Sequence, residues 1–243
     1  MSTATTERLY WENPRAKTAL ATVTGHRAGG FTLDRTLYHA ALPGYHHDQP
    51  PDLGHVLADG HKLKLVKVAW DRGFLVHRTH GPLPPLGAKA QLHLDAQRRE
   101  RQARAHTAMH LLVTALAESH GTLVEPPRVV GGGEARLHAR FREPTKDILP
   151  KVLSRAQQLA DAREDIVARW APREDAMKLA SHEPVPWRDI MPGEPTLRLV
   201  QCGKKSLLPC DAPLCAHTWE VGAMELALVQ ARSDAVRFGV KVA

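Results

Sequence analysis

The first part of the chain alternates apolar and polar side chains in short runs, and this two-residue period is typical of half-buried β-strands. The runs are bounded by turn formers, such as the glycine pair at residues 29–30 and the Gly- and Pro-rich stretch 81–87. Strands are predicted at residues 18–24, 31–34, 63–68, 74–77 and 89–95. Several short strands at this spacing predict a small β-barrel, which we expect to occupy residues 1–95.

From residue 96 the period of the apolar positions lengthens to that of a helix. Leu111, Leu112, Ala115 and Leu116 form the apolar stripe of a predicted helix over residues 98–118. Further helices are predicted over residues 147–170 and 172–179, and further strands over residues 135–141, 197–202 and 236–242. The chain is therefore predicted to be α+β, with an α+β domain at residues 96–243 after the small N-terminal β-barrel.

His106 and His110 stand four residues apart in the predicted helix 98–118. At about 3.6 residues per turn they lie on one helix face, where two imidazoles can hold one metal ion. The chain has 15 histidines, so such a pair also arises by chance as packed or solvated side chains. Far along the chain, Cys210 in a proline-bounded turn supplies a thiolate, which makes a normal zinc set with two imidazoles. We therefore predict zinc ligands at His106, His110 and Cys210.

The composition of the chain indicates which kind of binding partner and which cellular compartment to expect. Lysine and arginine number 33 against 26 aspartate and glutamate residues, and the resulting net charge of +7 suits a polyanion such as nucleic acid. No amino-terminal apolar run resembles a signal peptide, and no stretch approaches the roughly 18 apolar residues of a membrane span. The chain has 3 cysteines, an odd number, which does not suggest a framework of disulfides. We therefore expect a soluble protein of the reducing cytoplasm, with no membrane partner.

Residues 104–112, which include the histidine pair, resemble the signature helix of the alanyl-tRNA editing family. That family comprises the editing domain of alanyl-tRNA synthetase and its freestanding relatives, the AlaX proteins. Residues 31–38 resemble the LDRTLFYP strand of the family's barrel, residues 172–176 the segment before its last strands, and residues 210–222 the pattern CGGTHVxxTxEIG. The matched positions of that last pattern are Cys210, Thr218, Glu220 and Gly222. The resemblance implies an N-terminal β-barrel followed by an alanyl-tRNA-editing-type domain that binds Zn²⁺.

Two segments depart from the family pattern. Leu214 stands where the family has its last histidine ligand, so a fourth ligand would come from Cys215, from His217 or from water. We favour Cys215, with a buried, small apolar cysteine as the alternative. The family's barrel also carries a Gly-Gly-Gln loop, which corresponds to residues 42–49 of this chain. Only Gly44 is a candidate match to a residue of that loop.

The resemblance implies a trans-editing hydrolase that deacylates mischarged Ser-tRNA(Ala), or Gly-tRNA(Ala), at a zinc site. Thr107, beside the first histidine, is the candidate catalytic hydrogen-bond donor, although a helix threonine is more often packed or solvated. One competing hypothesis is a degenerate, non-catalytic relative that binds tRNA. Another is a hydrolase of a different aminoacyl-tRNA or of a small aminoacyl ester.

The implied partner is alanine tRNA, contacted at its acceptor end, and not DNA. Arg98, Arg101 and Arg104 follow one another at a spacing of three and are the candidate contacts to RNA phosphates. The alternative is a solvated helix face on which Glu100 pairs with a neighbouring arginine. The sequence makes no prediction about the oligomeric state.

Overall fold

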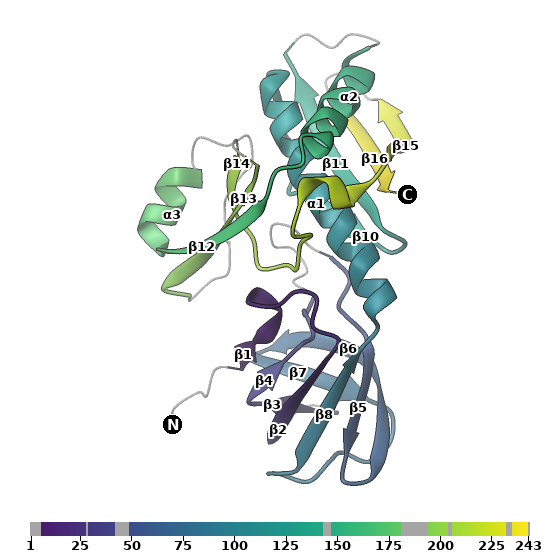
Figure 1. The fold of residues 1–243 in the computed structure, drawn as a ribbon, viewed down its shortest axis with the longest axis vertical. Coiled ribbons are helices and arrows are strands. Elements are labelled where there is room, and N and C mark those ends of the chain that lie inside the picture. Colours follow the sequence, from purple (N-terminus) through teal and green to yellow (C-terminus); the bar gives the residue numbers. More distant parts are fainter. Residues whose placement is uncertain are drawn as a thin grey trace. The chain divides into compact units, whose positions relative to one another are not determined.

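The computed structural model describes residues 6–27, 29–41, 49–142, 147–180, 194–203, 206–231 and 235–242. The chain divides into two compact units, shown in Figure 1. The first comprises Met1–Leu42 and Pro50–Glu100, and the second comprises Pro43–Gln49 and Arg101–Ala243. A closed barrel together with open sheets and helices confirms the predicted α+β class. The predicted domains, residues 1–95 and 96–243, stay a prediction.

The first unit is built on a closed barrel with the strand order β2-β3-β7-β6-β5-β8. The elements of this unit are β1 (Glu7–Arg8), the 3-10 helix η1 (Leu9–Trp11), β2 (Thr18–Arg27), β3 (Gly30–Leu33), β4 (Arg35–Thr36), β5 (Gly54–Ala58), β6 (His61–Asp71), β7 (Phe74–Thr79) and β8 (Lys89–Leu94). Five of these strands fall where the two-residue period predicts them. The barrel strand β5 was not predicted; it is five residues long and pairs along its length with β8.

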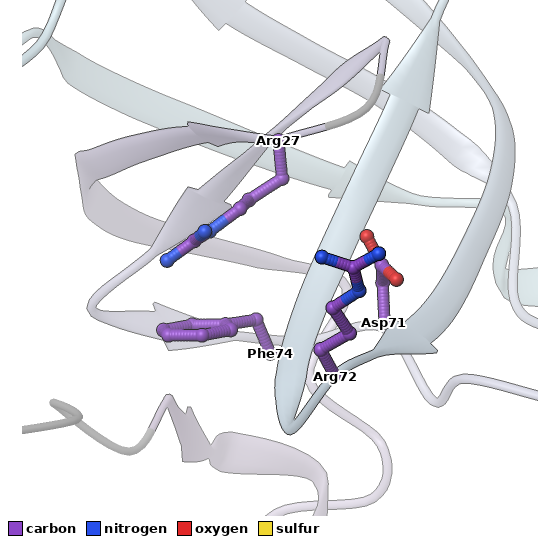
Figure 2. Close-up of a pocket in the computed structure, with 4 residues that line it drawn as sticks. All are labelled: Arg27, Asp71, Arg72 and Phe74. Atoms are coloured by element: carbon purple, nitrogen blue, oxygen red, sulfur yellow. The ribbon is translucent and has the colours of Figure 1, made fainter.

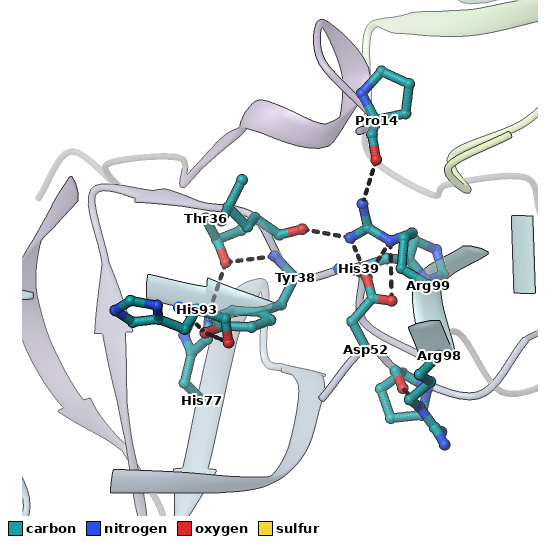
Figure 3. Close-up of polar contacts among 11 residues, drawn as sticks. Pro14, Thr36, Tyr38, His39, Asp52, His77, His93, Arg98 and Arg99 are labelled. Carbon is teal, nitrogen blue, oxygen red and sulfur yellow. Dashed lines mark hydrogen bonds and ion pairs between the residues drawn. The ribbon is translucent and has the colours of Figure 1, made fainter. Parts of the chain in front are cut away.

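Side chains of the barrel strands point inward and form an apolar core, against which the buried His77 packs. Its Nδ1–H donates to the carbonyl of Phe31 at 3.3 Å, and its Nε2 lies 2.8 Å from the hydroxyl of Thr36. That hydroxyl accepts the backbone N–H of Tyr38 and therefore donates its own proton to the imidazole (Figure 3). Burial lowers the pKa of His77 from 6.5 to about 4, so the ring is neutral at physiological pH.

A second polar group of the first unit is the buried ion pair between Arg99 and Asp52 (Figure 3). The guanidinium also donates to the carbonyls of Pro14 at 3.0 Å and Leu37 at 2.6 Å, while the carboxylate accepts the backbone N–H of His39 at 2.7 Å. All charged atoms of the pair thus have partners, which a buried ion pair requires. The pair fixes the start of helix α1 (Ala96–Glu118) within the first unit.

The described part of the second unit contains two sheets. One has the order β10-β11-β16-β15 with β9 beside β11, and the other has the order β12-β13-β14. The elements of this unit that follow α1 are β9 (Gly121–Leu123), β10 (Arg128–Val130), β11 (Glu134–Phe141), α2 (Ile148–Asp161), β12 (Ile166–Pro172), α3 (Arg173–Ala180), β13 (Thr196–Cys202), β14 (Ser206–Pro209), the 3-10 helix η2 (Thr218–Val221), β15 (Met224–Ala231) and β16 (Val236–Val242). No helix in the described part of the chain is long and apolar enough to cross a membrane.

The helix predicted over residues 147–170 is wrong in its second half. Helix α2 ends at Asp161, and Arg163 adopts a left-handed conformation with φ of 58°. The strand β12 that follows pairs with β13 from Ile166 to Pro172. Its branched and aromatic side chains suit a pleated surface, and pairing with a distant strand, which no local period reveals, decides its conformation.

Candidate metal centre

The centre begins with α1, whose second half is buried on all sides. His106 and His110 lie one turn apart on this helix, and neither side chain reaches solvent. Their ring centroids are 5.5 Å apart. Two imidazoles enclosed in an apolar core are costly to bury unless their nitrogens bind something, so their position itself indicates a polar role.

The cysteine reaches the histidines from β14 and the turn that follows it. Cys210 Sγ lies 3.5 Å from His106 Nε2, and the ligand atoms of His106, His110 and Cys210 all lie within 4.8 Å of one another. Among the described residues, this is the group of three or more His, Cys, Asp or Glu side chains that could hold a metal ion. The structure therefore brings together the three ligands that the sequence predicts.

The turn that carries Cys210 is held by Arg198 on β13. The backbone N–H of Cys210 donates to the carbonyl of Arg198 at 3.0 Å. In return, the buried Arg198 guanidinium donates to the carbonyls of Cys210 and Ala212 at 3.0 and 3.1 Å. The arginine thus fixes the thiol-bearing turn and places a positive charge beside it.

Gln49 orients the first histidine, although no pattern in the sequence predicts this role. Its Oε1 lies 2.8 Å from His106 Nδ1, and both side chains are buried. Because an amide oxygen only accepts hydrogen bonds, the imidazole proton sits on Nδ1, and Nε2 presents its lone pair toward Cys210. This is the arrangement in which a histidine ligates a metal through Nε2. Gln49 closes the loop 42–49, whose Gly44 lies outside the described residues.

The electrostatics of the group fit a bound cation. Burial raises the pKa of the Cys210 thiol to about 12, and the Arg198 guanidinium opposes this rise only in part. Burial, followed by the neighbouring His106 and Arg198, holds the pKa of His110 well below 6.5. His110 is therefore neutral, as a histidine ligand must be, and the Cys210 thiol needs a nearby cation to ionise. Two nitrogens and one sulfur suit a borderline-soft ion such as Zn²⁺ better than the hard ions Mg²⁺ or Ca²⁺.

The structure gives Thr107 a place in the framework of the centre. Its hydroxyl donates to the carbonyl of Ala103 at 2.8 Å and accepts the backbone N–H of Cys215 at 3.1 Å. The threonine thereby ties α1 to the turn after β14. Its catalytic role stays a prediction.

The candidates for a fourth ligand lie in the same turn. Cys215 is buried but is not a member of the group of three within the described residues, and its ligand role stays a prediction. Leu214 is buried in the apolar core of the second unit. His217 is partly exposed, and its Nδ1 lies 2.9 Å from a carboxylate oxygen of Asp165.

The three predicted RNA-binding arginines differ in their surroundings. Arg98 Nε donates to the carbonyl of Pro51 at 3.2 Å. Arg104 donates twice to the carbonyl of Val221, at 2.9 and 3.1 Å, and Arg101 is exposed. Two of the three guanidiniums thus already bind backbone oxygens, and the RNA contacts stay a prediction.

The fold and the site together define an α+β protein with a β-barrel unit and a buried candidate metal centre. No protein-family model matches the chain. The chain is similar to the alanine–tRNA ligases of several archaea. It is 27% identical to that of Archaeoglobus fulgidus over 233 residues, which are 95% of this chain and 25% of the ligase. It is 26% identical to that of Korarchaeum cryptofilum over 223 residues, 91% of this chain and 24% of the ligase.

The alanine–tRNA ligase of Hyperthermus butylicus is 28% identical over 233 residues, again 95% of this chain and 25% of the ligase. The chain therefore spans about a quarter of the length of the curated relatives that it matches. This consistent homology to one region of alanyl-tRNA synthetase confirms the resemblance predicted from the motifs.

Proposed function

We propose that the chain is a trans-editing hydrolase that removes serine, or glycine, wrongly esterified to alanine tRNA. The observation that carries the proposal is the buried group of His106, His110 and Cys210, in a chain homologous to a region of alanyl-tRNA synthetase. The substrate would be the aminoacylated acceptor end of the tRNA, met in the cytoplasm. The metal would be Zn²⁺, held by the two imidazoles and the thiolate.

Hydrolysis of an aminoacyl ester needs an oriented water and stabilisation of the oxyanion that forms at the carbonyl carbon. When bound, Zn²⁺ supplies Lewis acidity and lowers the pKa of a bound water to about 7. The chain contributes the arrangement of the ligands. Gln49 fixes the tautomer of His106, Arg198 holds the cysteine turn, and Thr107 joins that turn to the helix.

A group of three ligands suits a catalytic metal, whereas the fourth ligand predicted at Cys215 would favour a structural or substrate-anchoring one. Structural zinc sites have four protein ligands as a rule, whereas catalytic sites have three and keep one position for water or substrate. Three side chains, His106, His110 and Cys210, form the group within the described residues.

Leu214 favours a second candidate function. It lies in the apolar core, at the position where the family resemblance expects a histidine ligand. This loss suits a non-catalytic relative that binds tRNA, or a hydrolase whose substrate is another aminoacyl ester. Direct measurement of ester hydrolysis separates these functions.

The test compares release of amino acid from seryl-, glycyl- and alanyl-tRNA(Ala) by the native protein and by Cys210→Ala. We expect rapid release of serine or glycine by the native protein, and loss of activity by more than about 100-fold in the variant. The reason is that removing a ligand costs more than the 10–100-fold lost with an outer-shell partner. Cys202→Ala is the matched control, because Cys202 is also buried in the core but lies outside the group.

Zinc content is measured on the same preparations. Serine release by the native protein and by Cys202→Ala, with neither zinc nor release in Cys210→Ala, supports the proposal. A native protein that binds tRNA but hydrolyses none of the three esters overturns the proposed editing activity and leaves the two alternatives, a tRNA-binding protein and a hydrolase of another aminoacyl ester.

A further inference from the structure

A cavity of about 290 Å³ lies in the first unit. It is lined by Arg27, Asp71, Arg72 and Phe74 (Figure 2). Arg27 is the last residue of β2, while Asp71 and Phe74 are the last residue of β6 and the first of β7. The cavity therefore lies where the side chain at the end of β2 reaches the turn between β6 and β7.

The turn between β6 and β7 is unusual in carrying an arginine. Asp71 pairs with Phe74, so Arg72 and Gly73 form a two-residue hairpin turn. Both have left-handed backbones, with φ of 48° and 83°. Such turns prefer Asn, Asp or Gly at the first position, since other side chains are strained there. The left-handed backbone at Arg72 therefore destabilises the fold, which suggests that an arginine is retained there because its guanidinium binds a ligand.

The second guanidinium is fixed on an aromatic ring. The Arg27 guanidinium carbon lies 4.0 Å from the centroid of the Phe74 ring, and Figure 2 shows the group above the ring, with the Arg72 guanidinium beside it. Stacking uses the flat face of a guanidinium and leaves its N–H edge for hydrogen bonds. Both arginines are exposed, so these donors can reach a ligand.

We propose that this cavity binds one nucleotide of an RNA chain, with the phosphate on Arg27 and Arg72. Guanidiniums bind phosphate oxygens in pairs of hydrogen bonds, and a planar cation on an aromatic ring is a surface on which a base can stack. The Asp71 carboxylate accepts hydrogen bonds, which the ribose hydroxyl or the amino group of a base can donate. The cavity volume of about 290 Å³ lies just below the roughly 300 Å³ at which small-molecule pockets begin, so the proposed occupant is a single nucleotide.

The proposal rests on the proposed function in one respect, the identity of the RNA as alanine tRNA. The chemistry of the cavity and the net charge of +7 are independent of any hydrolysis. Uncharged alanine tRNA is therefore the probe, because it carries no ester and its binding is measured apart from editing.

The experiment measures binding of fluorescently labelled, uncharged alanine tRNA by anisotropy over a series of salt concentrations. The full chain is compared with Arg27→Gln, Arg72→Asn and the double variant. We expect each single change to lower the slope of log affinity against log salt by about 1, and the double change by about 2, because each arginine neutralises one phosphate. Arg15→Gln, an exposed arginine of the same unit outside the cavity, is the control and should bind as the native chain does.

Arg72→Asn separates binding from folding. Asparagine suits the left-handed turn position, so this variant should unfold at the same temperature as the native chain or higher while binding RNA more weakly. Unchanged affinity and salt slope in the double variant would overturn the proposal. So would 5′-AMP that displaces the tRNA while binding as tightly as the tRNA itself, since the cavity would then be a mononucleotide site. Intact tRNA binding without ester hydrolysis overturns only the proposed function.

Discussion

The hydrogen bond between His106 and Gln49 decides which imidazole nitrogen faces the cysteine. With the proton on Nδ1, the lone pair of Nε2 points to the place where the other two ligand atoms converge. Outer-shell partners of this kind raise the basicity of a histidine ligand and hold its ring. A residue far from the helix in sequence therefore helps to form the candidate metal centre.

Replacing that amide tests its role. Gln49→Leu should weaken zinc binding by about 10–100-fold, because His106 loses the acceptor that fixes its tautomer. The measurement is competition for zinc with a coloured chelator at pH 7. Gln91→Leu, on an exposed barrel position, is the control and should keep the native affinity. An equal affinity in Gln49→Leu would show that the amide does not support the ligand.

The buried His77 makes the stability of the barrel depend on pH. The pKa of His77 is about 4 in the folded chain, against 6.5 for an unperturbed histidine. Between pH 4 and pH 6.5 the unfolded chain therefore binds more protons than the folded chain. The contribution of the neutral His77 ring to the free energy of unfolding is therefore fully present above pH 6.5. It is lost as the pH falls toward 4, by about 3 kcal/mol in total. Urea unfolding at pH 7 and pH 4.5 should show that His77→Gln loses less stability than the native chain. His80→Gln, an exposed control, should follow the native curve.

At the scale of elements, the sequence predicts most of the helices and strands whose apolar side chains repeat with a regular period. The strands of the barrel and the long helix α1 carry a repeating pattern, and His106 and His110 follow from that helical period. Cys210 could be found by its chemistry alone. Gln49 could not, because a loop has no period and its contact with His106 spans 57 residues. The strand β12 was mistaken for helix for the same reason, since only pairing with β13 selects its conformation.

Substitution of Arg163 tests the boundary between α2, which ends at Asp161, and the strand β12 that follows. Arg163 holds a left-handed backbone, which costs an arginine about 1–2 kcal/mol more than a glycine. Arg163→Gly should therefore stabilise the chain by about 0.5–1 kcal/mol in thermal unfolding. Arg163→Ala keeps the strained backbone but loses the guanidinium that lies 5.8 Å from the Trp219 ring, so it reports the value of that contact. A glycine variant less stable than the alanine variant would contradict the prediction.

At the scale of the whole molecule, the similarity to alanine–tRNA ligases runs through both compact units. It covers 95% of the chain and a quarter of the Archaeoglobus fulgidus enzyme. The barrel unit and the unit with the candidate metal centre are thus matched together. This continuity is consistent with tasks divided between them, RNA binding in the first and ester chemistry in the second, as proposed above.

Metal binding should stabilise the folded chain, because the three ligands come from segments about one hundred residues apart and converge only after folding. At a zinc concentration 100 times the dissociation constant, the expected gain is about 2.7 kcal/mol. Thermal unfolding with and without zinc measures it. Cys210→Ser should abolish the gain and Cys202→Ser should retain it. The same gain in both variants would mean that zinc binds elsewhere.

The buried ion pair of Arg99 and Asp52 has an evolutionary consequence. Removing either partner alone strands a charge in the interior at a cost of about 3–5 kcal/mol, whereas exchanging both for apolar residues is often tolerated. Intermediate sequences with one partner are therefore selected against. Among related chains, the two positions should change together or not at all, and this covariation would be visible in any sufficiently deep set of sequences.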